Sequence, residues 1–153
     1  ADMLVLDGRD ARLHFLGIDG ILTATCCPNC VSYEGPRLSR YALDGGSEVL
    51  SCEDAGDTMY IEEELVRIFE NDLILGETPV PLFCGARFED TCTLGGFALW
   101  WQDWEYTTCP DCGQPMKYLM QIHWDALTDY MEGTLYIEFC PDCQIVSMQH
   151  QQT

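Results

Sequence analysis

Positive charge is scarce in this sequence. Seven Lys and Arg residues stand against 26 Asp and Glu, which gives a formal net charge of −19. Phosphate backbones and anionic membrane surfaces are bound through basic side chains, so direct nucleic-acid and membrane partners are excluded. A basic protein surface fits the charge better, with solubility alone as the alternative explanation.

Long apolar runs and secretion signals are also missing. No stretch approaches the roughly 20 apolar residues that cross a bilayer, and no basic segment followed by an apolar one opens the chain. The sequence therefore predicts no transmembrane segment and shows no secretory signal, with a mature form that has lost its signal as the alternative.

Histidine is equally sparse, and the familiar catalytic motifs are absent. The three histidines lie too far apart for metal-ligand spacing. The chain contains no His-Glu-x-x-His, no Gly-x-Ser-x-Gly and no Gly-rich phosphate loop. These gaps argue against an enzyme, although a thiol redox enzyme and a zinc hydrolase stay open as alternatives.

Cysteine, by contrast, is abundant. The chain has 153 residues, of which 47% are hydrophobic, enough for one domain or two closely packed lobes. Six of its ten cysteines form three Cys-Pro-x-Cys knuckles, at 27–30, 109–112 and 140–143. This spacing suits metal ligation better than structural disulfides. The pattern therefore predicts a reducing compartment, the cytoplasm.

The second and third knuckles carry the strongest metal signal. Cys109 and Cys112 precede Cys140 and Cys143 by a separation at which four thiolates can bind one tetrahedral Zn²⁺. Proline after the first cysteine of each knuckle restricts the turn before metal binds. We therefore predict a four-cysteine zinc site. A redox dithiol pair or disulfides are the alternatives.

Part of the third knuckle's surroundings is repeated near the N-terminus. Residues 19–30 match 132–143 at a constant offset of 113, with an acidic residue and Gly, then Leu, then the knuckle. A second metal site could combine Cys27, Cys30 and Cys52 with one of Cys26, Cys84 or Cys92. The preferred alternative is that Cys52, Cys84 and Cys92 are ordinary buried thiols.

Hydrophobic patterning predicts a mostly β chain with little helix. Strands are expected at 3–6, 13–16, 48–51, 116–124, 133–139 and 145–153. Residues 33–47 are expected to be loop, 61–70 a short acidic helix, and 73–82 a connector between halves.

Tryptophan is concentrated in one segment. Trp100, Trp101 and Trp104 fall within five residues. They either fill the core and the interface between lobes, or form an aromatic surface for a partner, since Trp is enriched at binding hot spots.

Motifs across 94–146 resemble the C-terminal domain of programmed cell death protein 2, and are similar to the bacterial YwqG-like domain family of unknown function. These motifs are Leu94-Gly95-Gly96-x-x-x-Trp100-x-Gln102, Cys109-Pro110-x-Cys112-Gly113-x-x-Met116-x-x-Leu119-x-Gln121-Ile122, Gly133-x-Leu135-Tyr136 and Cys140-Pro141-x-Cys143. Ala98 departs from the family's usual proline. The resemblance implies an antiparallel β fold of two related halves. The eukaryotic relatives act as zinc-bearing chaperones for a basic ribosomal protein.

Together these observations predict a mainly β (α+β) fold with antiparallel sheets and one or two short helices. Its two related halves, 1–75 and 76–153, would form one compact unit held by the four-cysteine zinc site. The predicted function is a non-enzymatic zinc-binding module for a basic protein, either a ribosomal or nucleic-acid-binding protein or a toxin. An acidic DNA-mimicking inhibitor is a further alternative.

Overall fold

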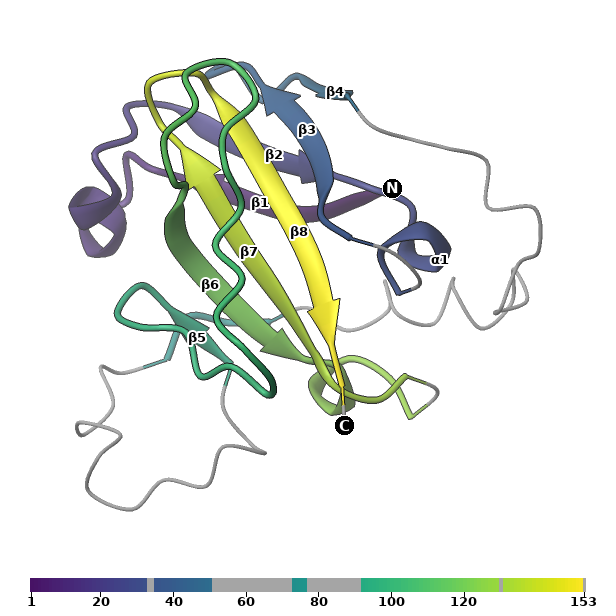
Figure 1. Cartoon of the computed structure of the whole chain (residues 1–153). Helices are drawn as coiled ribbons and strands as arrows, with labels where there is room; N and C mark the ends of the chain where they lie inside the picture. The colour runs from purple at the N-terminus through teal and green to yellow at the C-terminus, as the bar shows by residue number, and fades with distance from the viewer. Residues whose placement is uncertain (33–34, 51–72, 77–91, 130, 153) are drawn as a thin grey trace.

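The computed structural model describes residues 1–32, 35–50, 73–76, 92–129 and 131–152 (Figure 1). The described chain is mainly β, with one α-helical turn and two 3-10 helices. In chain order the elements are β1 (Asp2–Asp7), η1 (Ala11–Leu16), β2 (Ile21–Thr25), α1 (Pro28–Val31), β3 (Arg37–Tyr41), β4 (Ser47–Val49), β5 (Thr93–Leu94), β6 (Lys117–His123), η4 (Trp124–Ala126), β7 (Thr134–Cys140) and β8 (Ile145–Gln151).

The strands form two antiparallel sheets, as the sequence predicts. Six strands pair in the order β4-β3-β8-β7-β6-β5, while β1 and β2 pair separately and lie behind β7 and β8 in Figure 1. The larger sheet takes strands from both sides of the expected boundary between 1–75 and 76–153, because β3 pairs with β8. The division into two halves stays a prediction.

The main core lies between the two sheets. Alternate residues of β7, namely Leu135, Ile137 and Phe139, are buried there with side chains from β1, η1 and β2. Burying each such side chain contributes about 2 kcal/mol. The two-residue period of β7 therefore orients one face of the large sheet toward β1 and β2.

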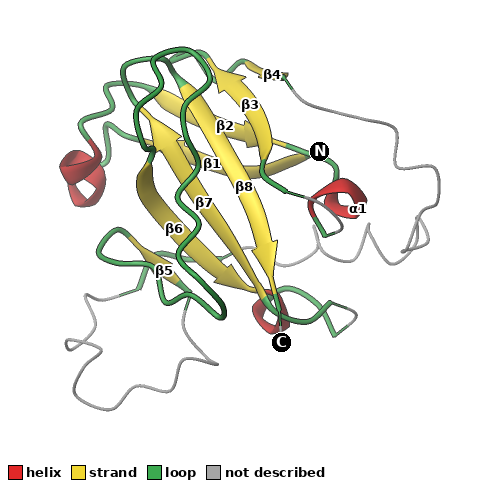
Figure 2. Ribbon diagram, in the orientation of Figure 1, coloured by secondary structure: helices red, strands yellow, loops and turns green. Residues whose placement is uncertain are grey.

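The opposite face of the large sheet is polar and also buried. Facing side chains of the paired strands include Tyr136 and the polar set Gln121, Thr134, Glu138, Ser147, Gln149 and Gln151, each at most 5% exposed. They are covered by residues 95–108, here called the strap, which cross in front of β7 and β8 without regular structure (Figure 2).

The strap lies on this face because its backbone is hydrogen-bonded to the sheet's side chains. The Tyr136 hydroxyl accepts from the Trp101 backbone N–H at 3.1 Å and donates to the Leu99 carbonyl at 2.5 Å. Glu138 accepts from the Thr107 N–H at 2.8 Å, and burial raises the pKa of this carboxyl. Buried polar groups need such partners, and the strap supplies them for much of this face, although the second Glu138 oxygen, Oε1, has none among the described residues.

Removing the Tyr136 hydroxyl is expected to loosen the strap. Tyr136→Phe leaves the Trp101 N–H and the Leu99 carbonyl without that partner, at a cost of about 1–3 kcal/mol in the free energy of unfolding. Hydrogen exchange should report faster exchange at Trp101. Tyr106→Phe, on a ring that is 44% exposed, is the matched control and should change neither measurement. Equal behaviour of the two variants would show that the hydroxyl does not anchor the strap.

Two of the predicted elements are wrong. Residues 13–16 belong to the 3-10 helix η1, because Asp10 caps its start by accepting from the Arg12 N–H at 2.9 Å and Gly17 ends it at φ +68°. Residues 37–41, expected to be loop, form β3. Hydrogen-bonded pairing with β8 stabilises an extended conformation that the mixed polar and apolar pattern of this segment does not predict.

The other predicted strands are confirmed with small boundary shifts: 3–6 is β1, 48–51 overlaps β4, 116–124 is β6, 133–139 is β7 and the tail is β8. In the expected connector 73–82, residues 73–76 have no regular structure. The predicted helix at 61–70 and the rest of that connector lie outside the described residues.

Candidate metal centre

The second and third knuckles meet at one end of the large sheet. Residues 140–143 make the turn between β7 and β8, and residues 109–112 follow the strap shortly before β6. Their four sulfur atoms all lie within 4.8 Å of one another, and the Sγ atoms of Cys112 and Cys140 are 3.8 Å apart. A tetrahedral zinc with bonds of about 2.3 Å places its sulfurs about 3.8 Å apart. The four cysteines are thus close enough to hold one metal ion.

Each of these two knuckles ends in a left-handed residue. Gly113 follows Cys112 at φ +69°, and Gln144 follows Cys143 at φ +56°. In the first of them the Gly113 N–H donates to the Cys109 carbonyl at 2.9 Å. The left-handed residue reverses the direction of the chain after the second cysteine of each knuckle, and the sulfurs of both knuckles lie close together.

Burial divides the four clustered sulfurs into an inner and an outer set. Cys109 and Cys140 are buried, Cys143 is half-buried and Cys112 is exposed. The inner pair lies in a small apolar cluster with Met116 and Ile145. The cluster shields one side of the site from water.

The thiols of the cluster have divergent acidities. Burial alone would raise the pKa of Cys109, but N–H groups of Cys112 and Asp111 outweigh it and lower that pKa. Burial raises the pKa of Cys140, and burial together with the neighbouring thiols raises that of Cys143. Four thiolates this close repel one another, so a cation is what allows all of them to ionise together.

Arg40 joins the two knuckles from β3. Its guanidinium donates to the Cys143 carbonyl at 3.0 Å and to the Asp111 carboxylate at 2.9 Å. A cation next to a thiolate cluster also offsets negative charge, as outer-shell groups do at metal sites. Sequence reasoning missed Arg40 because it lies in a stretch expected to be loop. The one available signal was that Arg40 is among only seven basic residues in the chain.

The first knuckle differs in its local structure. Its cysteines belong to the cap and body of α1, where Cys27 is half-buried and Cys30 is buried, and Ser32 closes the turn with right-handed geometry. Among the described residues no group of three or more metal-ligand side chains includes them. Cys52 and Cys84 lie outside the described residues, so the second site stays a prediction.

Two further cysteines lie apart from the four. Cys26 is in the main core, where burial raises its pKa to about 12. Cys92, just before β5, is exposed, so the prediction of a buried thiol is wrong there, while Cys52 and Cys84 lie outside the described residues. Cys26, for which burial was not predicted, is the one of these two that packs as a small apolar side chain.

The three tryptophans take different positions along the strap. Trp100 stacks on Tyr136 with ring centroids 4.4 Å apart, and the Trp101 indole N–H donates to Thr134 at 2.7 Å. Both are half-buried, whereas Trp104 is 82% exposed. The segment thus contributes two rings to packing and leaves one in solvent.

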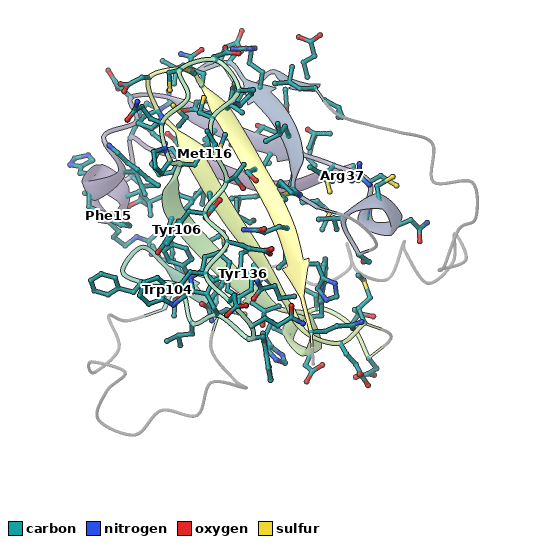
Figure 3. The ribbon with its side chains drawn as sticks, viewed as in Figure 1. Phe15, Arg37, Trp104, Tyr106, Met116 and Tyr136 are labelled. Atoms are coloured by element: carbon teal, nitrogen blue, oxygen red, sulfur yellow. The ribbon has the colours of Figure 1, made fainter. Side chains whose placement is uncertain are left out.

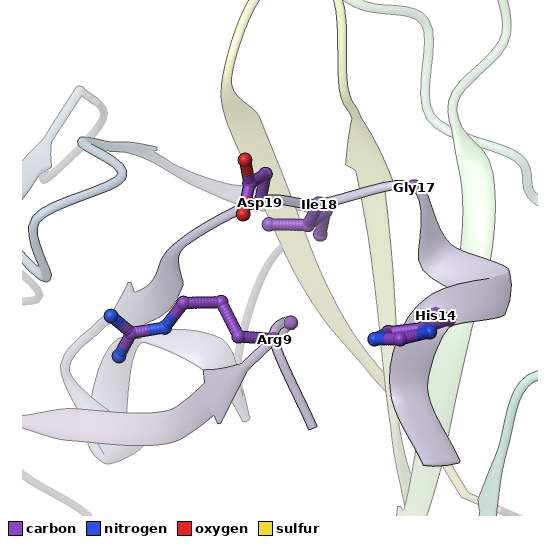
Figure 4. Close-up of a pocket in the computed structure, with 6 residues that line it drawn as sticks. Arg9, His14, Gly17, Ile18 and Asp19 are labelled. Atoms are coloured by element: carbon purple, nitrogen blue, oxygen red, sulfur yellow. The ribbon is translucent and has the colours of Figure 1, made fainter. Parts of the chain in front are cut away.

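A shallow hollow of about 340 Å³ lies beside η1, lined by Gly8, Arg9, His14, Gly17, Ile18 and Asp19 (Figure 4). The Arg9 guanidinium in this lining already forms an ion pair with the Asp7 carboxylate, with Nε and Oδ1 2.7 Å apart. None of the four clustered cysteines lines this hollow.

Comparison with known proteins finds a relative of uncharacterised function. The chain is 42% identical over 141 residues to "Uncharacterized protein YpfL" of Salmonella typhimurium, an alignment that covers 87% of this chain and 32% of that protein. No protein-family model matches the chain, and no solved structure matches it. The resemblance to programmed cell death protein 2 and to the YwqG-like family therefore stays a prediction. The chain spans about a third of the relative it matches, which is itself uncharacterised.

In the described residues, no helix has the length and apolar character needed to cross a bilayer.

Proposed function

We propose that this chain is a non-enzymatic, zinc-stabilised module that binds a basic protein partner in the cytoplasm. The observation that carries the proposal is the convergence of four cysteine sulfurs from two knuckles on one point. The proposal has two parts, a structural zinc ion and a basic partner, and each is supported separately.

Zinc is the metal that best fits the donor set. Thiolates favour soft or borderline metals, and a four-cysteine tetrahedral arrangement suits zinc or iron. Catalytic zinc usually keeps three protein ligands and one water, whereas four protein ligands leave no position for substrate. Cys109, Cys112, Cys140 and Cys143 would hold the ion. Its chemistry there would be structural, binding the strap's end to the β7–β8 turn.

A basic partner is supported by charge. The chain carries a formal net charge of −19, and a zinc ion held by four thiolates adds about −2. Such a field steers basic proteins toward the surface and repels nucleic acid. A ribosomal or nucleic-acid-binding protein, or a toxin, would have the required complementary charge.

The proposal is tested by counting metal and measuring binding in the same preparation. Native mass spectrometry should find zinc on the purified chain, and mutation of the four cysteines should remove one ion per chain. Binding to RNA-free basic ribosomal proteins should weaken steeply as salt rises, because the attraction is electrostatic. An acidic protein of similar size is the control ligand and should not bind.

Two results would contradict this function. A solvent oxygen among the metal's ligands in X-ray absorption would remove the argument for a closed, non-catalytic site. Absence of binding to any basic protein at low salt would reject the partner. Competition by duplex DNA for the captured protein would instead favour the DNA-mimic alternative.

A further inference from the structure

The strap exposes large aromatic rings to solvent. Phe97 is 84% exposed, Trp104 82% and Tyr106 44%. Tryptophan side chains are highly buried on average, because their apolar area is large. Exposed aromatic rings concentrated in one segment are typical of a surface that a partner covers.

The backbone on each side of Trp104 is held to the sheet. The Gln151 side-chain amide donates to the Asp103 carbonyl at 3.2 Å, and the Gln149 amide donates to the Glu105 carbonyl at 2.5 Å. The strap is therefore ordered before any partner arrives. Order in the free state lowers the entropic cost of binding.

The same segment is free of positive charge. Residues 92–115 contain no Lys or Arg, and Asp103 and Glu105 flank Trp104 directly. In the described structure these two residues are exposed, and Figure 3 shows the indole of Trp104 on the strap, in front of the sheet. The Glu105 carboxylate accepts from the Gln151 side-chain amide at 3.3 Å, whereas the Asp103 carboxylate accepts no hydrogen bond from the described residues. The surface thus combines an aromatic ring with the exposed carboxylate of its chain neighbour Asp103.

Resting on the proposed function, we propose that the basic partner docks at this surface through an arginine-rich segment, with one guanidinium stacked on Trp104. A guanidinium is planar, so it can lie on an indole face and still donate to the neighbouring Asp103 carboxylate. A lysine ammonium lacks that planar fork and is more strongly hydrated. Arginine therefore fits this surface better than lysine does.

The test uses two synthetic peptides of equal length, one alternating Arg with Gly and one alternating Lys with Gly, on the zinc-loaded chain. The Arg peptide should bind several-fold more tightly. Trp104→Ala should weaken Arg-peptide binding about tenfold and remove the preference over Lys. Trp104→Phe should retain part of it. The ring is exposed, so these variants should fold normally, which circular dichroism checks.

Matched controls separate a local site from the overall acidic field. Val5→Ala truncates a 60% exposed apolar side chain on β1 and should bind like the wild type. Asp103→Asn and Glu48→Gln each remove one negative charge, and only the former lies beside Trp104. We expect Asp103→Asn to weaken Arg-peptide binding several-fold more than Glu48→Gln.

The outcomes distinguish this inference from the function it rests on. If the wild type binds both peptides but Trp104→Ala does so equally well, the strap is not the docking surface, while the basic-partner function stands. If the two charge variants lose affinity equally, binding is governed by net charge and the local site is rejected. If the wild type binds neither peptide at low salt, the proposed function fails and this inference fails with it. Preference for single-stranded nucleic acid over both peptides would also overturn it.

Discussion

Replacing Cys109 by serine is expected to release the metal ion and destabilise the fold severely. Cys109 is the fully buried member of the four-cysteine cluster, with its sulfur within 4.8 Å of the other three. Structural zinc sites contribute an apparent 10–16 kcal/mol in small domains at neutral pH, roughly equal to the whole stability of such a domain. We therefore expect a loss of at least about 4 kcal/mol in the free energy of unfolding. Thermal unfolding followed by circular dichroism measures it.

Cys92→Ser is the matched control, because it makes the same chemical change at an exposed cysteine outside the cluster. It should retain the metal and the wild-type melting temperature. Treating the wild type with a strong chelator should reproduce the unfolding of Cys109→Ser. A Cys109→Ser protein that keeps both its zinc and its stability would show that these sulfurs do not hold a structural ion.

Replacing Gly133 by alanine should be the second most damaging change. Gly133 has φ +90°, and a Cβ placed on it would lie well inside van der Waals contact with the Gln151 carbonyl oxygen. The backbone conformation alone costs about 1–3 kcal/mol for a residue with a side chain. Because the opposing atom is backbone at the end of β8, relief requires moving the strand. We expect a total loss of about 3–4 kcal/mol.

Gly96→Ala separates these two contributions. Gly96 has φ +82°, and a Cβ there would meet nothing within 4 Å. Its cost should therefore be only the conformational part, about 1–2 kcal/mol. Chemical denaturation of both variants at equal metal loading gives the difference. Equal losses would show that contact with β8 does not make Gly133 essential.

Gly20 gives the internal repeat a physical meaning. It matches Gly133 at the offset of 113, and a Cβ on it would lie 2.5 Å from the Leu43 carbonyl oxygen. At both places a strand begins where another backbone segment approaches closely. The repeat diverges beyond the strand, because Cys30 lies within α1 whereas Cys143 is followed by the left-handed Gln144.

The sequence predicted the parts of this protein that depend on local pattern. Alternating side chains set the strands β6, β7 and β8, since a period of two is a property of each segment alone. The Cys-Pro-x-Cys spacing likewise indicated which four sulfurs meet, because a knuckle presents both of its thiols together. It erred at 13–16 and 37–41, where capping by Asp10 and pairing with β8 outweighed weak propensities.

Local pattern was therefore enough to predict the strands β6, β7 and β8 and the group of four cysteines, and composition gave the acidity. Folding brings Arg40 between Asp111 and Cys143 and lays the strap over a polar sheet face with Trp104 left outside, neither of which was predicted. These features could not be predicted because the residues involved are far apart along the chain. These contacts join residues that are up to 103 positions apart, so they depend on the packing and hydrogen bonding of the whole sheet, which no local pattern encodes.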